Sequence, residues 1–137
     1  MNRFAALFGG IVVVGIGSLG MTTFHASTIP YAKGDVKVHC RNGNTAAFVT
    51  PQKISIKVGD AIEWSTAGSV VADSIQITLK DPKQAWPFNG AAPSGGGTVG
   101  SGAAQTRGTF GYNVIVVCRK AGGGTERVVI DPDIIID

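Results

Sequence analysis

Two cysteines, Cys40 and Cys118, and two histidines, His25 and His39, are the residues of this 137-residue chain whose types could most readily do chemistry. Nucleophilic catalysis by serine or cysteine needs a histidine placed against the nucleophile. His39 directly precedes Cys40, and neighbouring residues on a β-strand point to opposite faces of the sheet. The spacing therefore predicts no catalytic residues, and we expect the chain not to be an enzyme.

Three carboxylates gather within residues 131–137, at Asp131, Asp133 and Asp137. A calcium loop of the EF-hand type needs more oxygen ligands, arranged around a glycine, than this segment offers. We interpret the segment as a turn at Asp131-Pro132 followed by an edge strand that faces solvent. No metal site is expected in it.

Residues 4–24 form an uncharged, apolar segment that could place these residues at a membrane. About twenty helical residues span about 30 Å, the thickness of the hydrocarbon core of a bilayer. Because Arg3 precedes the segment, the positive-inside rule puts the N-terminus in the cytoplasm. Residues 1–27 are therefore predicted to be a transmembrane helix or signal-anchor of the inner membrane, with the domain in the periplasm or extracellular space. The alternative is a cleaved secretory signal, although the cleavage sites near residues 24–27 are poor.

Small residues recur within this apolar segment at a spacing of four, as in Ala5/Gly9 and Ala6/Gly10. Such spacing lets a neighbouring transmembrane helix approach closely. The alternative is that glycine is simply common in membrane spans. On the first interpretation, other membrane-protein subunits pack against the helix at Gly9, Gly10, Gly15 and Gly17.

The rest of the chain reads as a linker over residues 28–34 and a β-sandwich domain over residues 35–137. Apolar and polar residues alternate with a period of two, and turn residues separate the alternating segments. Nothing has helical periodicity. Many short strands in about 100 residues predict an all-β Greek-key sandwich. The predicted strands are residues 35–41, 45–50, 54–58, 61–65, 73–80, 110–119, 125–130 and possible strand 133–136.

Residues 89–109 break the alternation, because nearly all of them are Gly, Ala, Ser or Thr. A connection of this length without secondary structure is uncommon in a compact domain, and it tends to be either functional or flexible. It lacks the Gly-Lys-Ser/Thr ending of a nucleotide-binding loop. We expect a long Gly-rich surface loop that becomes ordered only against a partner, with plain disorder as the alternative.

Residues of equal parity on one strand share a face, so the alternation also predicts the core. Cys40 and Cys118 both have the parity of core residues. In an extracytoplasmic compartment such a pair most simply forms a disulfide, and two free buried thiols are the alternative. The predicted core consists of Val36, Val38, Cys40, Ile54, Ile56, Val58, Ile62, Trp64, Ile75, Ile77, Leu79, Val114, Val116 and Cys118.

Two stretches, KVGDAIEW at residues 57–64 and FGYNVIVVC at residues 110–118, resemble the cupredoxin family. In that family one strand ends in Val-Gly-Asp and a late strand ends in a copper-binding cysteine. The resemblance implies a cupredoxin-like sandwich in which Cys118 falls on a ligand position. It also implies electron transfer through one copper, bound by two histidines, a cysteine and usually a methionine.

The copper ligands of that family are mostly missing from this chain. Residues 65–74 contain no histidine, and residues 119–124 contain neither histidine nor methionine. A blue-copper site needs imidazole and thiolate ligands that converge on one metal. We therefore expect a scaffold without copper or any other cofactor, in which Cys118 serves the disulfide, and a copper electron carrier is a minor alternative.

An immunoglobulin-like sandwich is the rival topology. The order Cys40, Trp64, Cys118 loosely mimics the Cys-Trp-Cys order of those domains. The tyrosine expected two residues before the second cysteine is Val116 here, which favours the cupredoxin-like version.

The aromatic pair Trp86 and Phe88 is the feature that most suggests binding. It lies in a loop that begins at Asp81, and Lys80 and Lys83 are close to it in sequence. Aromatic residues beside basic ones suit a bilayer interface or the centre of a protein interface. The alternative is a hydrophobic plug that covers one end of the sandwich.

The net charge of the chain excludes one class of function. A formal net charge of +3 is too small for a nucleic-acid binder that works by neutralising phosphates. We expect a non-catalytic, single-pass accessory or structural subunit of a membrane protein complex, and by analogy with copper proteins its host would be a photosynthetic or respiratory electron-transfer assembly. The alternative is a secreted or periplasmic soluble binding domain released by signal-peptide cleavage.

Overall fold

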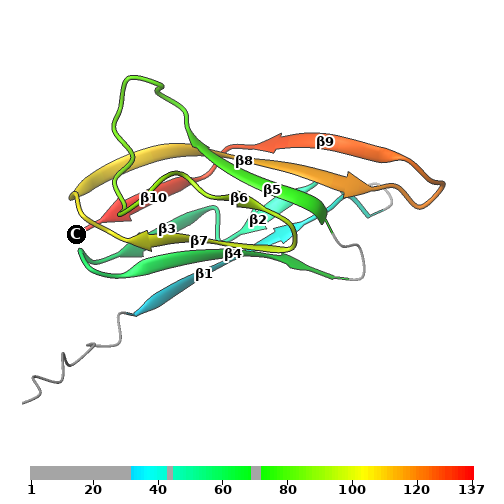
Figure 1. Cartoon of the computed structure of the whole chain (residues 1–137). Helices are drawn as coiled ribbons and strands as arrows, with labels where there is room; N and C mark the ends of the chain where they lie inside the picture. The colour runs from blue at the N-terminus through cyan, green and yellow to red at the C-terminus, as the bar shows by residue number, and fades with distance from the viewer. Residues whose placement is uncertain (1–31, 43–44, 69–71) are drawn as a thin grey trace, which may run out of the picture.

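Two β-sheets face each other in the computed structural model, which describes residues 32–42, 45–68 and 72–137 (Figure 1). One sheet has the strand order β2-β1-β4-β7, and the other has the order β3-β10-β8-β5-β6, with β9 paired to β8. The all-β, two-sheet prediction is confirmed. The strands are β1 (Lys33–His39), β2 (Phe48–Thr50), β3 (Lys53–Ile56), β4 (Ala61–Ala67), β5 (Ala72–Leu79), β6 (Ser94–Gly95), β7 (Thr98–Ala103), β8 (Gly108–Arg119), β9 (Thr125–Ile130) and β10 (Asp133–Ile136).

Both sheets mix parallel and antiparallel pairs. β1 runs parallel to β4 along its whole length, from Lys33 opposite Ala61 to His39 opposite Ala67. β3 runs parallel to β10, and the chain passes from one sheet to the other between β2 and β3, where the Thr50-Pro51 bond is cis. An immunoglobulin sandwich is built from antiparallel sheets. The two parallel pairs therefore differ from the rival topology.

No helix long and apolar enough to cross a bilayer occurs among residues 32–42, 45–68 and 72–137. The predicted membrane segment, with Gly9, Gly10, Gly15 and Gly17, lies outside the described residues. So does most of the predicted linker over residues 28–34. The end of that linker differs from the prediction, because β1 already begins at Lys33.

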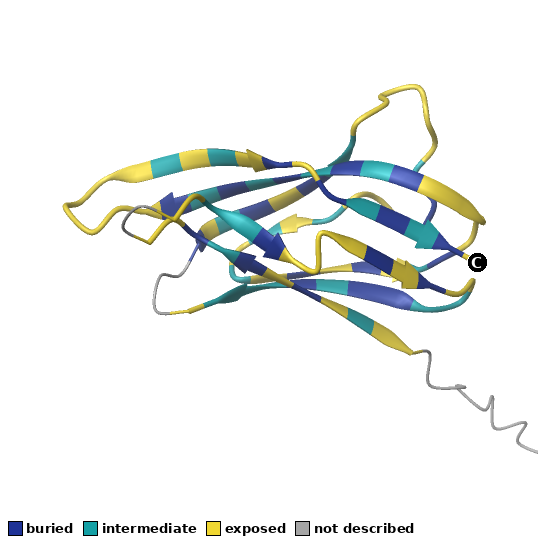
Figure 2. Ribbon diagram, turned by 180° about the vertical axis from the view of Figure 1, so that it is seen from behind, coloured by how far each residue is buried: buried dark blue, intermediate teal, exposed yellow. Residues whose placement is uncertain are grey.

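The core lies between the sheets and follows the predicted alternation, which Figure 2 shows as buried and exposed bands along each strand. Trp64 and Tyr112 are the largest side chains that are completely buried. Two predicted core residues depart from expectation. Val58 is 44% exposed because β3 ends at Ile56 and Val58 lies in the following turn, and Leu79, the last residue of β5, is only half-buried.

The Gly-rich interval 89–109 is not the single long loop that was expected. It contains β6 and β7, and β8 begins at Gly108. β7 forms an edge of the first sheet by antiparallel pairing with β4, and it buries Val99 and Ser101. The alternation was missed because β7 reads TVGSGA, in which glycines and a serine replace the usual large residues.

Candidate functional site

The disulfide between Cys40 and Cys118 joins the two sheets at one end of the sandwich. Cys40 directly follows β1 in one sheet, and Cys118 lies near the end of β8 in the other, with 5.7 Å between their Cα atoms. Their side chains are 8% and 2% exposed. The predicted disulfide is confirmed, and the alternative of two free thiols is wrong.

The bridge also determines what Cys118 can do. A metal ligand or nucleophile must be a thiolate. The sulfur of Cys118 is bonded to that of Cys40 instead, so it is not a thiolate in this state. The position that the family resemblance assigns to a copper ligand is therefore occupied by a structural cross-link.

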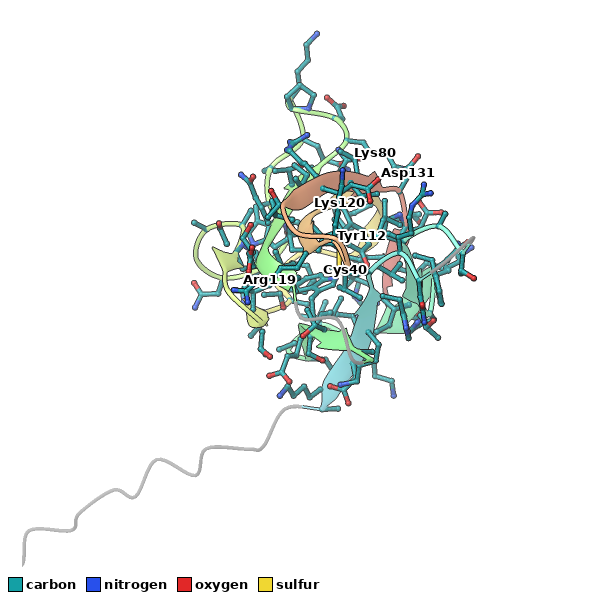
Figure 3. All side chains as sticks on the ribbon, turned by 90° about the vertical axis from the view of Figure 1, so that its right-hand side faces the viewer. Cys40, Lys80, Tyr112, Arg119, Lys120 and Asp131 are labelled. Atoms are coloured by element: carbon teal, nitrogen blue, oxygen red, sulfur yellow. A yellow bond between two sulfur atoms is a disulfide. The ribbon has the colours of Figure 1, made fainter. Side chains whose placement is uncertain are left out.

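A hollow of about 490 Å³ opens over the β8 side of this disulfide end. Figure 3 looks onto this end, with Cys40 near the centre of the view, Lys120 above it and Arg119 to one side. Two basic side chains at this end form ion pairs. The Nε of Arg41 is 3.8 Å from a carboxylate oxygen of Glu126, and the Nε of Arg119 is 2.6 Å from a carboxylate oxygen of Asp73. The hollow is lined by Arg41, Asn42, Cys118, Arg119, Lys120, Ala121 and Glu126.

The turn between β8 and β9 supports this hollow with a fixed backbone. The amide of Lys120 donates to the carbonyl of Gly124, and the amide of Gly123 donates to the carbonyl of Lys120. Gly123 and Gly124 have positive φ angles of 92° and 78°, which only glycine adopts without strain. Lys120 has no ion pair within the described part of the chain. Lys120 is also exposed, so its ammonium faces solvent.

A second hollow, of about 240 Å³, lies on the β1 side of the disulfide and contains His39 and Cys40. The imidazole of His39 stacks on the ring of Phe48, its antiparallel neighbour in β2, with the ring centroids 4.3 Å apart and the planes 5° apart. His39 is half-buried, in keeping with its outward parity. The two hollows flank the disulfide, so one end of the sandwich carries a histidine, three basic side chains and two carboxylates around a cross-link.

The charged side chains at this end can bind ionic groups. No group of three or more His, Cys, Asp or Glu side chains that could hold a metal ion is found among the residues that the structure describes. Guanidinium and ammonium groups suit carboxylates and phosphates, and exposed ion pairs such as these rearrange at little cost. The arrangement offers a charged contact surface in which basic groups outnumber acidic ones.

Behind this end, Tyr112 and Trp64 form a polar contact inside the core. The indole Nε1 of Trp64 donates a hydrogen bond of 3.2 Å to the hydroxyl of Tyr112, and the rings meet edge to face with 5.8 Å between centroids. Burial raises the pKa of Tyr112 to about 12, although the hydrogen bond from Trp64 acts in the opposite direction. The phenol therefore stays protonated at any physiological pH and holds the two sheets together as a neutral group.

Trp86 and Phe88 lie away from the disulfide end and differ from each other in exposure. Phe88 is 4% exposed and belongs to the core, so it is not the exposed contact residue that was predicted. It is held there by a bridge to Ala104 and by packing against Trp86, with 5.1 Å between the ring centroids. Trp86 packs against the core and is half-buried. The alternative of a hydrophobic plug at one end of the sandwich therefore fits Phe88, whereas Trp86 remains partly exposed at the surface.

The prediction of a solvated edge strand at residues 131–137 is wrong, because β10 lies between β3 and β8 and buries Ile134 and Ile136. The carboxylates there are also partly paired. The Nζ of Lys80 forms an ion pair with Asp131 and lies 3.8 Å from a carboxylate oxygen of Asp133 (Figure 3). These contacts join the end of β5 to the start of β10. They also pair the ammonium of Lys80 with carboxylates. Lys80 was one of the two lysines whose nearness to Trp86 suggested contact with a bilayer.

Sequence reasoning did not select Arg41, Arg119 and Lys120 as site residues. A signal for them was available, because each cysteine is followed directly by arginine, in Cys40-Arg41 and in Cys118-Arg119-Lys120. Once the cysteines are paired, the residues after them must lie at the same end of the molecule. Asn42 and Glu126 carry no comparable signal, because their place depends on how the loops fold.

Comparison with known proteins gives a similarity of fold at most. No protein-family model matches the chain, and no curated protein matches it. A solved structure of a pseudoazurin from Sinorhizobium meliloti is similar with a TM-score of 0.41 and 15% sequence identity, covering 77% of this chain and 74% of that chain.

Proposed function

We propose that this chain is a non-catalytic accessory subunit of a membrane protein complex, tethered by residues 4–24 with its β-sandwich on the extracytoplasmic side. The disulfide between Cys40 and Cys118 is the observation that supports it best. Disulfides form and persist in oxidising compartments and are rare in the cytoplasm. An oxidised domain that follows an apolar segment of bilayer length fits a tethered extracytoplasmic domain.

We also propose that the sandwich is a cupredoxin-like scaffold without a copper site. The mixed sheets and the position of Cys118 near the end of a late strand support the scaffold. The disulfide supports the loss of copper, since Cys118 is committed to Cys40. Metal analysis of the purified oxidised chain should find no stoichiometric copper, and one copper per chain would instead support an electron carrier.

The disulfide end is the proposed contact surface for the partner subunit. Arginine is enriched in protein interfaces, and this end carries Arg41 and Arg119 together with Lys120. The chain enters the domain at the other end of β1, where the amide of Ala32 donates to Asp60. At about 3.3 Å per residue, β1 alone separates the two ends by roughly 20 Å. The tether therefore leaves the disulfide end accessible.

Membrane fractionation tests the proposal directly. Native membranes are isolated and solubilised mildly, and the proteins that co-purify with the chain are identified. We expect the chain in the membrane fraction with a constant set of partners. A mature protein that begins near residue 27 and stays in the soluble fraction would contradict the subunit proposal and support the alternative of a soluble periplasmic or secreted binding domain.

Charge reversal tests the contact surface separately. Arg41→Glu and Lys120→Glu should each weaken co-purification, because both replace a basic group at the hollow with an acidic one. Lys53→Glu is the matched control, since Lys53 is exposed on β3 and lines neither hollow. Equal loss of partners in all three variants would mean that overall charge, rather than this end, determines association.

A further inference from the structure

A third hollow, of about 280 Å³, lies between the end of β5 and the loop of residues 80–93, far from the disulfide end. This loop stands out from the sandwich at the top of Figure 1. The hollow combines apolar and polar side chains. It is lined by the apolar side chains of Leu79, Pro82, Trp86 and Ala92 and by the polar side chains of Thr78, Asp81 and Gln84.

The loop that carries Trp86 is held in place on both sides. Before the indole, the carboxylate of Asp81 accepts a 2.9 Å hydrogen bond from the amide of Lys83, which fixes a turn. After it, the carbonyl of Pro87 accepts a 2.7 Å bond from the amide of Gln105, and Phe88 is buried in the core. The hollow is therefore largely preformed, as small-molecule sites usually are.

Several polar groups at the hollow lack partners within the described part of the chain. The indole Nε1 of Trp86 is buried and donates to no acceptor. The side chains of Thr78 and Gln84 make no hydrogen bond there, and Asp81 uses only its Oδ1. A buried donor without an acceptor is destabilising, and native structures rarely keep one without a reason. A ligand in the hollow can accept from Nε1 only if the ring turns, since that atom is buried.

The charges around the hollow disfavour an anionic membrane surface as the ligand. Lys80 is paired with Asp131 and Asp133 and does not line the hollow. The carboxylate of Asp81 lines it, whereas Lys83 does not. The lining therefore contains one acidic group and no basic group, the opposite of what anionic lipid headgroups attract.

We propose that this hollow is a saccharide-binding site in which a pyranose ring lies against the indole of Trp86. A pyranose has one face of C–H groups, which suits the apolar side chains of the lining, and a rim of hydroxyls that both donate and accept hydrogen bonds. Those hydroxyls can donate to Asp81, accept from Trp86 Nε1 and do either with Thr78 and Gln84. A purely apolar ligand would leave these polar groups without partners. The proposal depends on this hollow alone and holds whether or not the chain is a subunit of a complex.

Fluorescence titration of the full chain tests the proposal, because Trp86 and the fully buried Trp64 are its two tryptophans. The chain is kept in a detergent without sugar, such as lauryldimethylamine oxide, since maltoside detergents could occupy the site. The probes are cellohexaose, chitohexaose, mannohexaose and maltohexaose. We expect at least one to change the indole emission saturably in the micromolar to millimolar range, and calorimetry should give the same affinity.

Variants identify the site. Trp86→Ala should weaken binding of the active saccharide by at least about tenfold, as expected for a central aromatic contact. Gln84→Ala should weaken it less, and it keeps the proposal testable if Trp86→Ala fails to fold. Gln76→Ala is the matched control, because Gln76 is an exposed glutamine of β5 that does not line the hollow.

Three outcomes would overturn the proposal. The first is that no saccharide gives a saturable response by either method. The second is that Trp86→Ala and Gln84→Ala, correctly folded, bind as well as Gln76→Ala. The third is a response through Trp86 to a soluble short-chain phosphatidylglycerol and to none of the four saccharides, which would identify the hollow as a lipid contact. None of these outcomes depends on whether partner proteins co-purify with the chain.

Discussion

At the scale of single residues, two covalent or hydrogen-bonded links between the sheets distinguish this sandwich from a purely apolar one. The first is the disulfide, and the second is the bond from Trp64 to the hydroxyl of Tyr112. Both lie inside the core, where losing one partner leaves the other without compensation. Each therefore gives a prediction that can be measured by unfolding.

Tyr112→Phe should lower the free energy of unfolding by about 1–3 kcal/mol, because Trp64 Nε1 loses its acceptor at a fully buried position. Urea denaturation followed by tryptophan emission measures this change. A loss within experimental error would mean that the indole finds another acceptor.

Tyr112 also predicts how stability depends on alkaline pH. Its pKa is raised to about 12 in the folded chain by burial, above its ordinary value near 10 in the unfolded chain. Its contribution is therefore complete below about pH 10 and decreases as the pH rises toward 12, because the unfolded chain ionises first. The loss should reach about 2–3 kcal/mol at most. Urea denaturation at pH 9, 10 and 11 should show this decrease in wild type, and Tyr112→Phe should lack that part of it.

Removing the disulfide should cost about 4 kcal/mol in the chain-entropy model, because the bridge closes a loop with a sequence separation of 78. Cys40→Ser and Cys118→Ser should be destabilised to a similar extent, and the double variant should be no worse than either. Thiol titration of the unfolded wild-type chain should find no free thiol without reductant. Clearly unequal single variants would show that one cysteine contributes through packing more than through the bridge.

At the scale of elements, β7 is a strand that the sequence pattern did not predict. The register between β4 and β7 shifts between Ala61 and Glu63, so two residues of β7, Ser101 and Gly102, lie opposite Ile62. The hydroxyl of Ser101 accepts a 2.9 Å hydrogen bond from the amide of Ile62 and donates to the carbonyl of Gly102. A β-bulge of this kind leaves a backbone group without its ladder partner. The serine supplies the missing partner.

Ser101→Ala should therefore destabilise the domain by about 1–3 kcal/mol, since the buried amide of Ile62 would lose its acceptor. Ser94→Ala is the matched control, because Ser94 lies in the neighbouring strand β6 and is exposed. The difference between the two unfolding free energies measures the bond. Equal values would indicate that water or a backbone carbonyl replaces the hydroxyl.

Gly102→Ala should be more harmful than its exposed position suggests. Gly102 has a φ of 76°, and a Cβ there would overlap the backbone oxygen of Asn89. The conformation alone costs about 1–3 kcal/mol for a residue with a Cβ, and the overlap adds to it. Gly122→Ala is the control, since a Cβ there meets nothing within 4 Å and the φ of Gly122 lies outside the strained range. Thermal unfolding of the two variants should separate them clearly.

These details explain how far the sequence could predict the fold. The residues of β9 and β10 were predicted with their exact bounds, because Thr125–Ile130 and Asp133–Ile136 alternate between clear turns. β7 was missed because Val99 and Ser101 are small and glycines separate them. Alternation of apolar and polar residues is the signal that predicts a strand, and a glycine-rich edge strand shows it only weakly.

Some features of the candidate sites could likewise be predicted from the sequence, and others could not. The disulfide could be predicted, because the parity of Cys40 and Cys118 and the predicted extracytoplasmic compartment both favoured their pairing. The burial of Phe88 could not, since it depends on contact with Ala104, sixteen residues later in the chain and beside β7. The three hollows also depend on how loops from different strands meet, which no local pattern contains.

At the scale of the whole molecule, the disulfide end, the point where the chain enters the domain and the hollow beside Trp86 lie at different places on the sandwich. The charged disulfide end lies at one end of β1, and the chain enters the domain at the other. The hollow beside Trp86 lies on a third surface, at the loop between β5 and β6. The two proposed sites, one for a partner subunit and one for a saccharide, are therefore separate. Charge reversal at Lys120 should leave saccharide binding unchanged, and Trp86→Ala should leave co-purification unchanged.

The position of the disulfide also bears on how the domain would respond to mechanical load. When the two ends of the chain are pulled apart, the segment enclosed between Cys40 and Cys118 cannot extend, because the bridge carries the force past it. With a sequence separation of 78, the bridge prevents the extension of roughly 270 Å of chain contour length. Only the segments outside the bridge, which include β1, β9 and β10, can unravel. The redox state of one bond would therefore decide how far the domain can be stretched before its core is lost.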